Sequence, residues 1–231
     1  MLKKESSLIN SARFCDLMTE RGSATMLASI PFSGSEFAGP QLAGLLIAVS
    51  FAAGLNVYAT VATLGLLGHT HWLVLPPGLH LLTNWWVIGA ALALFAIEFF
   101  ADKVPAFDLF WNAFHTFVRI PVAALIAYNA TSQLSPEMQL LATVAGGAIA
   151  LAAHGSKTAA RIAVTPSPEP ISNIALSAGE DTLAIFLTWL ATQHPFAAGG
   201  IAVACLMVIA IMLRWTIRTI GRAFRTLATS S

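Results

Sequence analysis

Residues 196–213 contain no charged side chain, and this apolar run constrains the fold more than any other feature of the sequence. A helix of about 20 apolar residues crosses the hydrocarbon core of a bilayer. The rest of the chain is similar, since 57% of its 231 residues are hydrophobic and only 10% are charged. Soluble domains carry about 25% charged residues. A soluble fold of this length could not bury so much apolar surface, so the sequence predicts an all-α integral membrane protein.

Six transmembrane helices are expected, separated by short polar or proline-containing segments. Residues 1–38 before them are expected to form a flexible cytoplasmic tail, because no apolar run of secretory-signal length follows the basic start. Residues 214–231 after them form a basic, roughly helical tail suited to the membrane surface. The expected spans are 39–67, 84–101, 115–128, 137–164, 172–191 and 196–213.

The first and fourth expected spans are both overlong and interrupted by glycine or polar residues, at 54–58 and at 154–157. Their correspondence divides the chain into two three-helix halves, 39–135 and 136–213. An odd number of spans in each half turns the second half upside down relative to the first. The sequence thus favours a 3+3 inverted repeat with interrupted first and fourth helices, an arrangement that places a binding site near the bilayer midplane. Chance similarity of apolar segments is the alternative.

The basic residues predict the topology. Of the twelve Lys and Arg residues, four lie in the N-terminal tail and four in the C-terminal tail. Lys103 and Arg119 flank the second connector, and Lys157 and Arg161 precede the fourth. With six spans all twelve fall on one side, and the positive-inside rule makes that side the cytoplasm. We therefore expect a bacterial inner-membrane protein with both termini in the cytoplasm. The net charge of +1 gives no indication of nucleic-acid binding.

A cationic stripe is expected on the fourth span. His154, Lys157 and Arg161 follow spacings of three and four residues, so they share one face of a helix. This face is expected to point away from lipid. Lys157, His154 and Arg161 suit an anionic group such as a phosphate or a carboxylate headgroup. Arg161, Arg119 and Lys103 lie near the expected cytoplasmic ends, so we interpret them first as topology signals that snorkel to the interface.

Four acidic residues fall within or beside apolar spans. Glu98 and Asp102 are four residues apart and share a helix face. Glu180 and Asp181 are expected about 12–14 Å along the fifth span. Charges at such depth are costly, so we expect these acids to pair with the cationic stripe, to be protonated or to line water. Coupling to a proton or a sodium ion would follow. A static charge cluster that holds the bundle together is the alternative.

Three further polar residues complete the expected substrate site: Asn56, Tyr58 and Asn173. Asn56 and Tyr58 lie in the first interruption and could alternatively bridge helices. Asn173 or Ser172 is also the expected cap of the fifth span. No metal or cofactor is expected, because the two cysteines lie far apart and the histidines at 69, 71 and 80 have no neighbouring carboxylate or cysteine.

Several short motifs gather these polar residues. Together they resemble an integral-membrane family catalogued as domain of unknown function 4126, over about residues 37–195 with the sixth span implied. The resemblance brings no settled activity. The motifs are Gly54-Leu55-Asn56-x-Tyr58, Glu98-x3-Asp102-Lys103-Val-Pro105-x2-Asp108-x2-Trp111, His115-Thr116-x2-Arg119, His154-Gly-Ser-Lys157-x3-Arg161, Ser167-Pro-Glu169-Pro-x-Ser172-Asn173 and Glu180-Asp181.

The sequence favours a small transporter or channel-like protein that moves an anionic small molecule or a lipid headgroup. One alternative is a membrane enzyme acting on a lipid, although no recognised nucleophile or metal-ligand motif is present. The other is a non-catalytic scaffold that uses the basic C-terminal helix. The expected partners are the lipid bilayer and the anionic ligand, and association into a homo-oligomer is compatible with each hypothesis.

Overall fold

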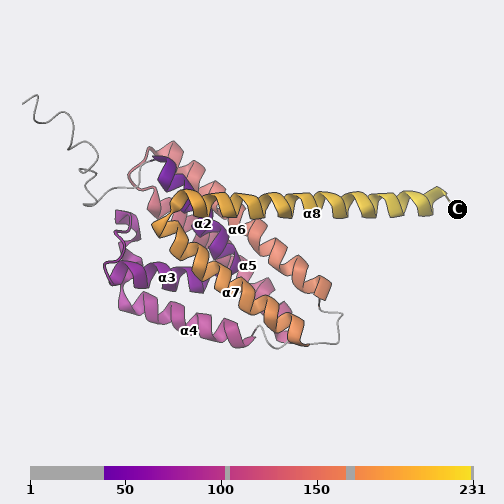
Figure 1. Ribbon diagram of the computed structural model, residues 1–231, viewed down its shortest axis with the longest axis horizontal. Helices are drawn as coiled ribbons and strands as arrows, with labels where there is room; N and C mark the ends of the chain where they lie inside the picture. Colours follow the sequence, from indigo (N-terminus) through magenta and orange to yellow (C-terminus); the bar gives the residue numbers. More distant parts are fainter. Residues whose placement is uncertain (1–38, 102–104, 165–169, 230–231) are drawn as a thin grey trace, which may run out of the picture. The chain divides into compact units, whose positions relative to one another are not determined.

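The computed structural model describes residues 39–101, 105–164 and 170–229, with side chains described for 39–101, 113–160 and 174–219. Every regular element in these ranges is a helix, which confirms the predicted all-α class (Figure 1). The predicted N-terminal tail lies outside the described residues. The elements are α2 (Gly39–Leu55), α3 (Val57–His69), the 3-10 helix η1 (Pro77–Thr83), α4 (Trp85–Ala101), α5 (Pro105–Ala130), α6 (Pro136–Val164), α7 (Pro170–Gln193) and α8 (Pro195–Thr229).

Several of these helices have the length and composition of membrane spans. Three qualify within the described ranges, namely Pro136–Ala160, Ile174–Gln193 and Pro195–Thr219. The pair η1 and α4, bent by 66°, would add a fourth. Helices α2 and α3 are apolar but shorter. The protein is therefore a membrane protein by these criteria, whereas the prediction of six spans is not confirmed.

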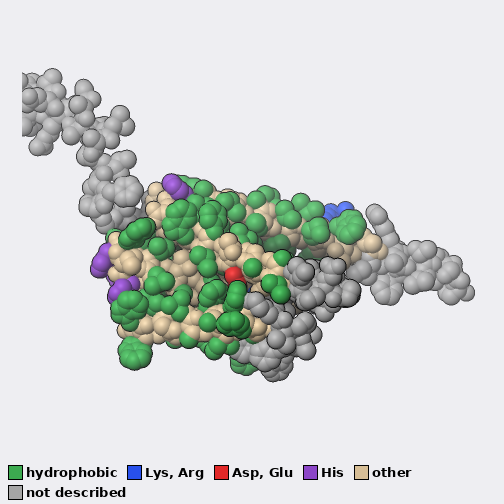
Figure 2. Space-filling view, turned by 60° about the horizontal axis from the view of Figure 1, so that its bottom comes forward, with side chains coloured by type: hydrophobic (Ala, Val, Ile, Leu, Met, Phe, Trp, Pro, Cys, Tyr) green, Lys and Arg blue, Asp and Glu red, His purple; other side chains and the backbone are tan. Residues whose placement is uncertain are grey.

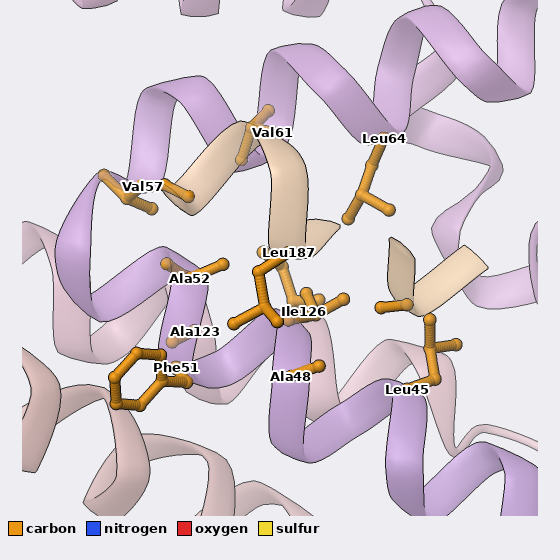
Figure 3. Close-up of a cluster of buried hydrophobic side chains, with 14 of the residues drawn as sticks. Leu45, Ala48, Phe51, Ala52, Val57, Val61, Leu64, Ala123, Ile126 and Leu187 are labelled. Carbon is orange, nitrogen blue, oxygen red and sulfur yellow. The ribbon is translucent and has the colours of Figure 1, made fainter. Parts of the chain in front are cut away.

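The chain reverses direction between α2 and α3. Leu45 and Leu64 line the same small apolar cavity, although they would be about 28 Å apart in a straight helix. Gly44 lies against the backbone of Pro195, so the beginning of α2 lies beside the start of α8. In Figure 3 the α3 residues from Val57 to Leu64 run in the opposite direction to the α2 residues from Ala52 to Leu45. The prediction of one interrupted span over 39–67 is not confirmed: these residues form two helices in a hairpin whose tip is Asn56.

The hairpin tip forms because the helix is capped at Asn56. This residue has extended backbone angles, φ −148° and ψ 103°, and its side chain accepts a hydrogen bond from the Ala59 amide. Asparagine is among the best residues at this position, since its side-chain oxygen satisfies one of the amides that begin a helix. The interruption predicted at 54–58 is therefore confirmed, at a single residue.

The second predicted interruption is absent. Helix α6 runs without a break from Pro136 to Val164, through His154 and Lys157. A glycine within a helix costs only about 1 kcal/mol, so Gly155 does not break it. The polar side chains find partners on neighbouring helices instead of opening the backbone. Without a matching break, the inverted repeat is not confirmed.

Three other boundaries differ from expectation. Helix α5 begins at Pro105, ten residues before the predicted start at 115, so the expected connector is helical. Helix α7 begins at Pro170, and the predicted cap at Asn173 or Ser172 is wrong because both lie inside the helix. Helix α8 continues to Thr229, so the last apolar span and the basic tail are one helix.

Small residues let the helices approach closely around α2, which packs against α5, α6, α7 and α8. Ala48 and Ala52 are fully buried on α2. Gly54 lies against Ala150 and Ala153 of α6, where an added Cβ would be 2.5 Å from the Ala150 carbonyl oxygen. Such small-residue contacts are typical of helix packing in membranes. Figure 3 shows this core, and Figure 2 shows how many larger hydrophobic side chains lie on the surface instead.

Candidate functional site

The hairpin tip leaves the last backbone carbonyls of α2 without helical partners, that of Leu55 among them. In a continuous helix the Ala59 amide would donate to the Leu55 carbonyl. Here the Ala59 amide donates to Asn56 Oδ1 at 2.9 Å. The Leu55 carbonyl oxygen instead accepts a hydrogen bond from Lys157 Nζ at 3.3 Å. The ammonium therefore meets the C-terminal end of α2, where the helix dipole favours positive charge.

The other side of the tip is held by a carboxylate. Asn56 Nδ2 donates a hydrogen bond to Asp181 Oδ1 at 2.8 Å, and both residues are buried. Asp181 belongs to α7 and lies beside the N-terminus of α3, where the dipole favours negative charge. At the tip, the C-terminal end of α2 thus meets the positive Lys157 of α6, and the N-terminal end of α3 lies beside the negative Asp181 of α7.

Lys157 also lies between two acidic residues. Its Nζ is 3.3 Å from Glu180 Oε2 of α7 and 3.6 Å from Glu98 Oε1 of α4. Glu98 in turn forms an ion pair with Arg119 of α5. The side chains of Glu98, Arg119 and Lys157 have no exposed surface, and that of Glu180 is 10% exposed. We call Glu98, Arg119, His154, Lys157, Glu180 and Asp181 the ionic cluster.

His154 links Arg119 to α6. Arg119 Nη1 is 2.9 Å from His154 Nδ1, and Thr116 Oγ1 is 2.6 Å from His154 Nε2. A guanidinium has donors only, so Nδ1 must accept and the imidazole proton must lie on Nε2. His154 is then neutral and donates a hydrogen bond to Thr116. In this arrangement the imidazole is engaged on both nitrogens.

The structure brings most of the predicted site residues together. The predicted pairing of the cationic stripe with intramembrane acids is confirmed for Lys157 with Glu180. Tyr58 lies at the margin, half-buried, with its ring edge-on to His115 at 5.6 Å between centroids. Asp102 and the side chains of Arg161 and Asn173 lie outside the described residues. The predicted residues that meet at the hairpin tip are Asn56, Glu98, His154, Lys157, Glu180 and Asp181.

Arg119 is the main residue that sequence reasoning placed wrongly. It was expected near the cytoplasmic interface, as a topology residue free to snorkel. The structure buries it completely, between Glu98 and His154. Its motif, His115-Thr116-x2-Arg119, does place Thr116 and Arg119 on one face of α5, toward His154. The Leu55 carbonyl was also missed, because a freed backbone group has no sequence pattern beyond the break itself.

A second group of histidines lies at the opposite end of the hairpin. His69, His71 and His80 line a cavity of about 300 Å³. His71 has a φ of 59°, an uncommon backbone angle for a residue other than glycine. Across the described residues, no three His, Cys, Asp or Glu side chains are arranged to hold a metal ion.

Comparisons with known proteins place the chain in a family. No curated protein matches the chain, and no solved structure does. One family model, described as "Domain of unknown function (DUF4126)", matches residues 43–215. The matched region includes the hairpin from residue 43 onward and all six members of the ionic cluster. The chain therefore belongs to the family of domain of unknown function DUF4126, as the motifs around the cluster indicate.

Proposed function

We propose that the protein is a membrane transporter that moves a small anion, or a lipid with an anionic headgroup, in a step coupled to protons. The observation that supports this most is the position of Lys157. It lies between a freed helix-end carbonyl and two buried carboxylates. Helices interrupted within the membrane, with charged groups at their ends, are typical of ion and substrate sites in transporters.

Binding of an anion requires a change in the bonds of Lys157. Its ammonium is engaged by Glu98 and Glu180, so an incoming phosphate or carboxylate must replace one of them. Glu180 is the residue to be replaced, because Glu98 is also held by Arg119 and has no exposed surface. Protonation of Glu180 would weaken its attraction to Lys157 and free the ammonium for the substrate. Proton uptake and anion binding are thereby coupled.

The membrane orientation is part of the proposal. Gly39 lines a cavity with Leu134 and Met138, at the end of the bundle where α5 is joined to α6. Helix α8 runs from that end toward its arginines, among them the exposed Arg214 and Arg218. By the positive-inside rule the arginine end faces the cytoplasm, so the start of α2 faces away from it, in contrast to the cytoplasmic N-terminus expected from the sequence. In a bacterium the membrane would be the inner membrane.

A static scaffold is the second candidate. It is favoured by the pairing of Lys157 and Arg119 with carboxylates of the protein itself. Buried ion pairs that do not move hold helices in register without binding a ligand. In that case neutralising Glu180 would change stability without affecting any flux.

The deciding experiment is a flux measurement in liposomes. Purified protein is reconstituted, and uptake of phosphate, small carboxylates and fluorescent anionic lipids is measured with and without a pH gradient. We expect flux that the gradient accelerates, loss of flux in Lys157→Ala, and flux independent of the gradient in Glu180→Gln. Arg218→Gln is the matched control, since Arg218 is exposed on α8. No flux of any of these anions, with all variants folded, would favour the scaffold.

A further inference from the structure

We infer that the oxygen atoms around Lys157 Nζ form a monovalent-cation site, which the lysine fills with its own ammonium. Among the described residues, oxygens from three helices face this nitrogen. They are the Leu55 carbonyl oxygen and Glu180 Oε2, both at 3.3 Å, and Glu98 Oε1 at 3.6 Å. A freed helix-end carbonyl together with carboxylates is the kind of oxygen set that coordinates sodium and similar ions at interrupted membrane helices.

The dimensions of the site favour a large monovalent cation. Oxygen ligands lie about 2.0–2.6 Å from Mg²⁺ or Ca²⁺. The distances around Lys157 Nζ, 3.3 to 3.6 Å, exceed the about 2.7–2.9 Å of close ammonium–oxygen hydrogen bonds, and they exceed the distances around a small divalent ion by more. Potassium, ammonium and small alkylammonium ions are the ligand class that this arrangement suits best.

The charges around the site show what removal of the lysine would leave. Glu98 retains Arg119, which also contacts His154. Glu180 and the Leu55 carbonyl would lose the ammonium that now lies between them. A vacated volume lined by two carboxylates and the negative end of a helix dipole attracts a cation. Loss of the lysine side chain should therefore create a cation requirement that the natural protein lacks.

This site has a consequence for coupling, and that consequence alone rests on the proposed function. A transporter whose cation site is filled by a tethered ammonium needs no sodium ion. Its coupling ion is a proton exchanged within the cluster. The existence of the site is independent of transport, because it is tested by stability and not by flux.

The test is the thermal unfolding of purified Lys157→Ala in different salts. Chlorides of sodium, potassium, ammonium, methylammonium and the bulky N-methylglucamine are compared at equal ionic strength. We expect a saturable rise in Tm of about 5–10 °C at 100 times the dissociation constant, with ammonium or methylammonium but not with N-methylglucamine. Natural protein and Lys157→Arg should show no cation-specific rise. A Tm of Lys157→Ala that is equal in all five salts would overturn the inference.

Two further variants guard against failure of Lys157→Ala to fold. Lys157→Ala combined with Glu180→Gln removes one charge of each sign. It is expected to destabilise the fold less than Lys157→Ala alone, because the loss of only one member of a buried ion pair is strongly destabilising. Its Tm should still rise with ammonium or methylammonium, but by less than that of Lys157→Ala. Lys157→Ala combined with Glu98→Gln, purified in methylammonium, should also bind the cation more weakly. If no Lys157→Ala variant can be purified folded with methylammonium present throughout, the inference is also wrong, because an occupied site must stabilise the fold.

Discussion

Helices α2 and α8 are both apolar, but they have opposite environments. Of the 17 residues of α2, eleven are buried. Helix α8 contains the candidate span with the highest mean hydropathy, 2.6 against 1.3 for each of the other two, and yet only 17% of that span is buried. Met207, Ile211 and Met212 of α8 are all exposed. In a bilayer, high hydropathy marks the surface that lipid covers and does not mark the core.

The interior near α2 is built from small residues and buried charges, not from large apolar side chains like those that α8 exposes. Alanine and glycine lie where α2 meets α6 and α8, and the hairpin tip brings buried charges into contact. Lipid is as apolar as leucine, so burial of a large aliphatic side chain gains little in a membrane. Close packing and satisfied polar groups supply the stability instead. Substitutions on α2 and at its tip should therefore be much more damaging than substitutions on α8.

The largest difference is expected between two glycines. In Gly54→Ala the new Cβ would lie 2.5 Å from the Ala150 carbonyl oxygen, whereas at Gly200 of α8 nothing lies within 4 Å. Gly54→Ala should force α2 from α6 and prevent recovery of folded protein, or lower its stability by about 3 kcal/mol or more. Gly200→Ala should be neutral or stabilise by up to about 1 kcal/mol. Monodispersity and Tm in detergent measure both, and equal effects would contradict the packing argument.

The next largest effect is expected at Glu98. Glu98→Gln leaves Arg119 buried without its carboxylate, and loss of one member of a buried pair costs about 3–5 kcal/mol. Arg214→Gln on the exposed part of α8 should change stability by less than about 0.5 kcal/mol. The double variant Glu98→Gln/Arg119→Gln should recover part of the loss in a double-mutant cycle measured by unfolding. A loss in the double variant equal to the sum of the single losses would show that the two residues are not coupled.

A smaller effect is expected at the hairpin cap. Asn56→Ala removes both the cap of α3 and a donor to the buried Asp181, for a combined cost of about 2–3 kcal/mol. Asn84 is the matched control, because its side chain accepts from the Trp86 amide at an exposed position. Asn84→Ala should cost about 0.5–1 kcal/mol. Hydrogen exchange at the Ala59 amide reports the cap directly, and unchanged protection there would contradict its role.

How far the sequence predicted the structure depends on the range of the interactions involved. The apolar segments and the break at Asn56 are local, and both were predictable from composition and spacing. The pairing of Lys157 with Glu180 was also predictable, because unpaired charges in lipid are too costly. The reversal at Asn56 was not, since a one-residue break is equally compatible with a kink. Whether the chain continues or returns is decided by distant contacts, such as the packing of Leu64 and Leu45 around one small cavity.

The burial of Arg119 illustrates the same limit at the candidate site. By sequence its position favoured an interfacial charge, because a predicted connector preceded it. The residues of that connector belong to α5, and this extension places Arg119 well inside the helix, within reach of Glu98 and His154. The continuity of α6 through His154 has a related cause. Polar residues in a membrane helix indicate a break only when neighbouring helices offer them no partners.

The smallest effect on stability is expected from substitutions on the exposed, lipid-facing side of α8. It shows how little an exposed apolar side chain contributes to the stability of this fold. Met212 is 58% exposed, whereas Leu187 of α7 is fully buried. Met212→Ala should lower stability by less than about 0.5 kcal/mol, because lipid or detergent replaces the lost contacts. Leu187→Ala leaves a cavity that lipid cannot fill and should cost about 2–5 kcal/mol. Unfolding in detergent and in lipid nanodiscs gives both values. A loss of 2 kcal/mol or more in Met212→Ala would mean that this face of α8 packs against protein and not lipid, for example against a second copy of the chain.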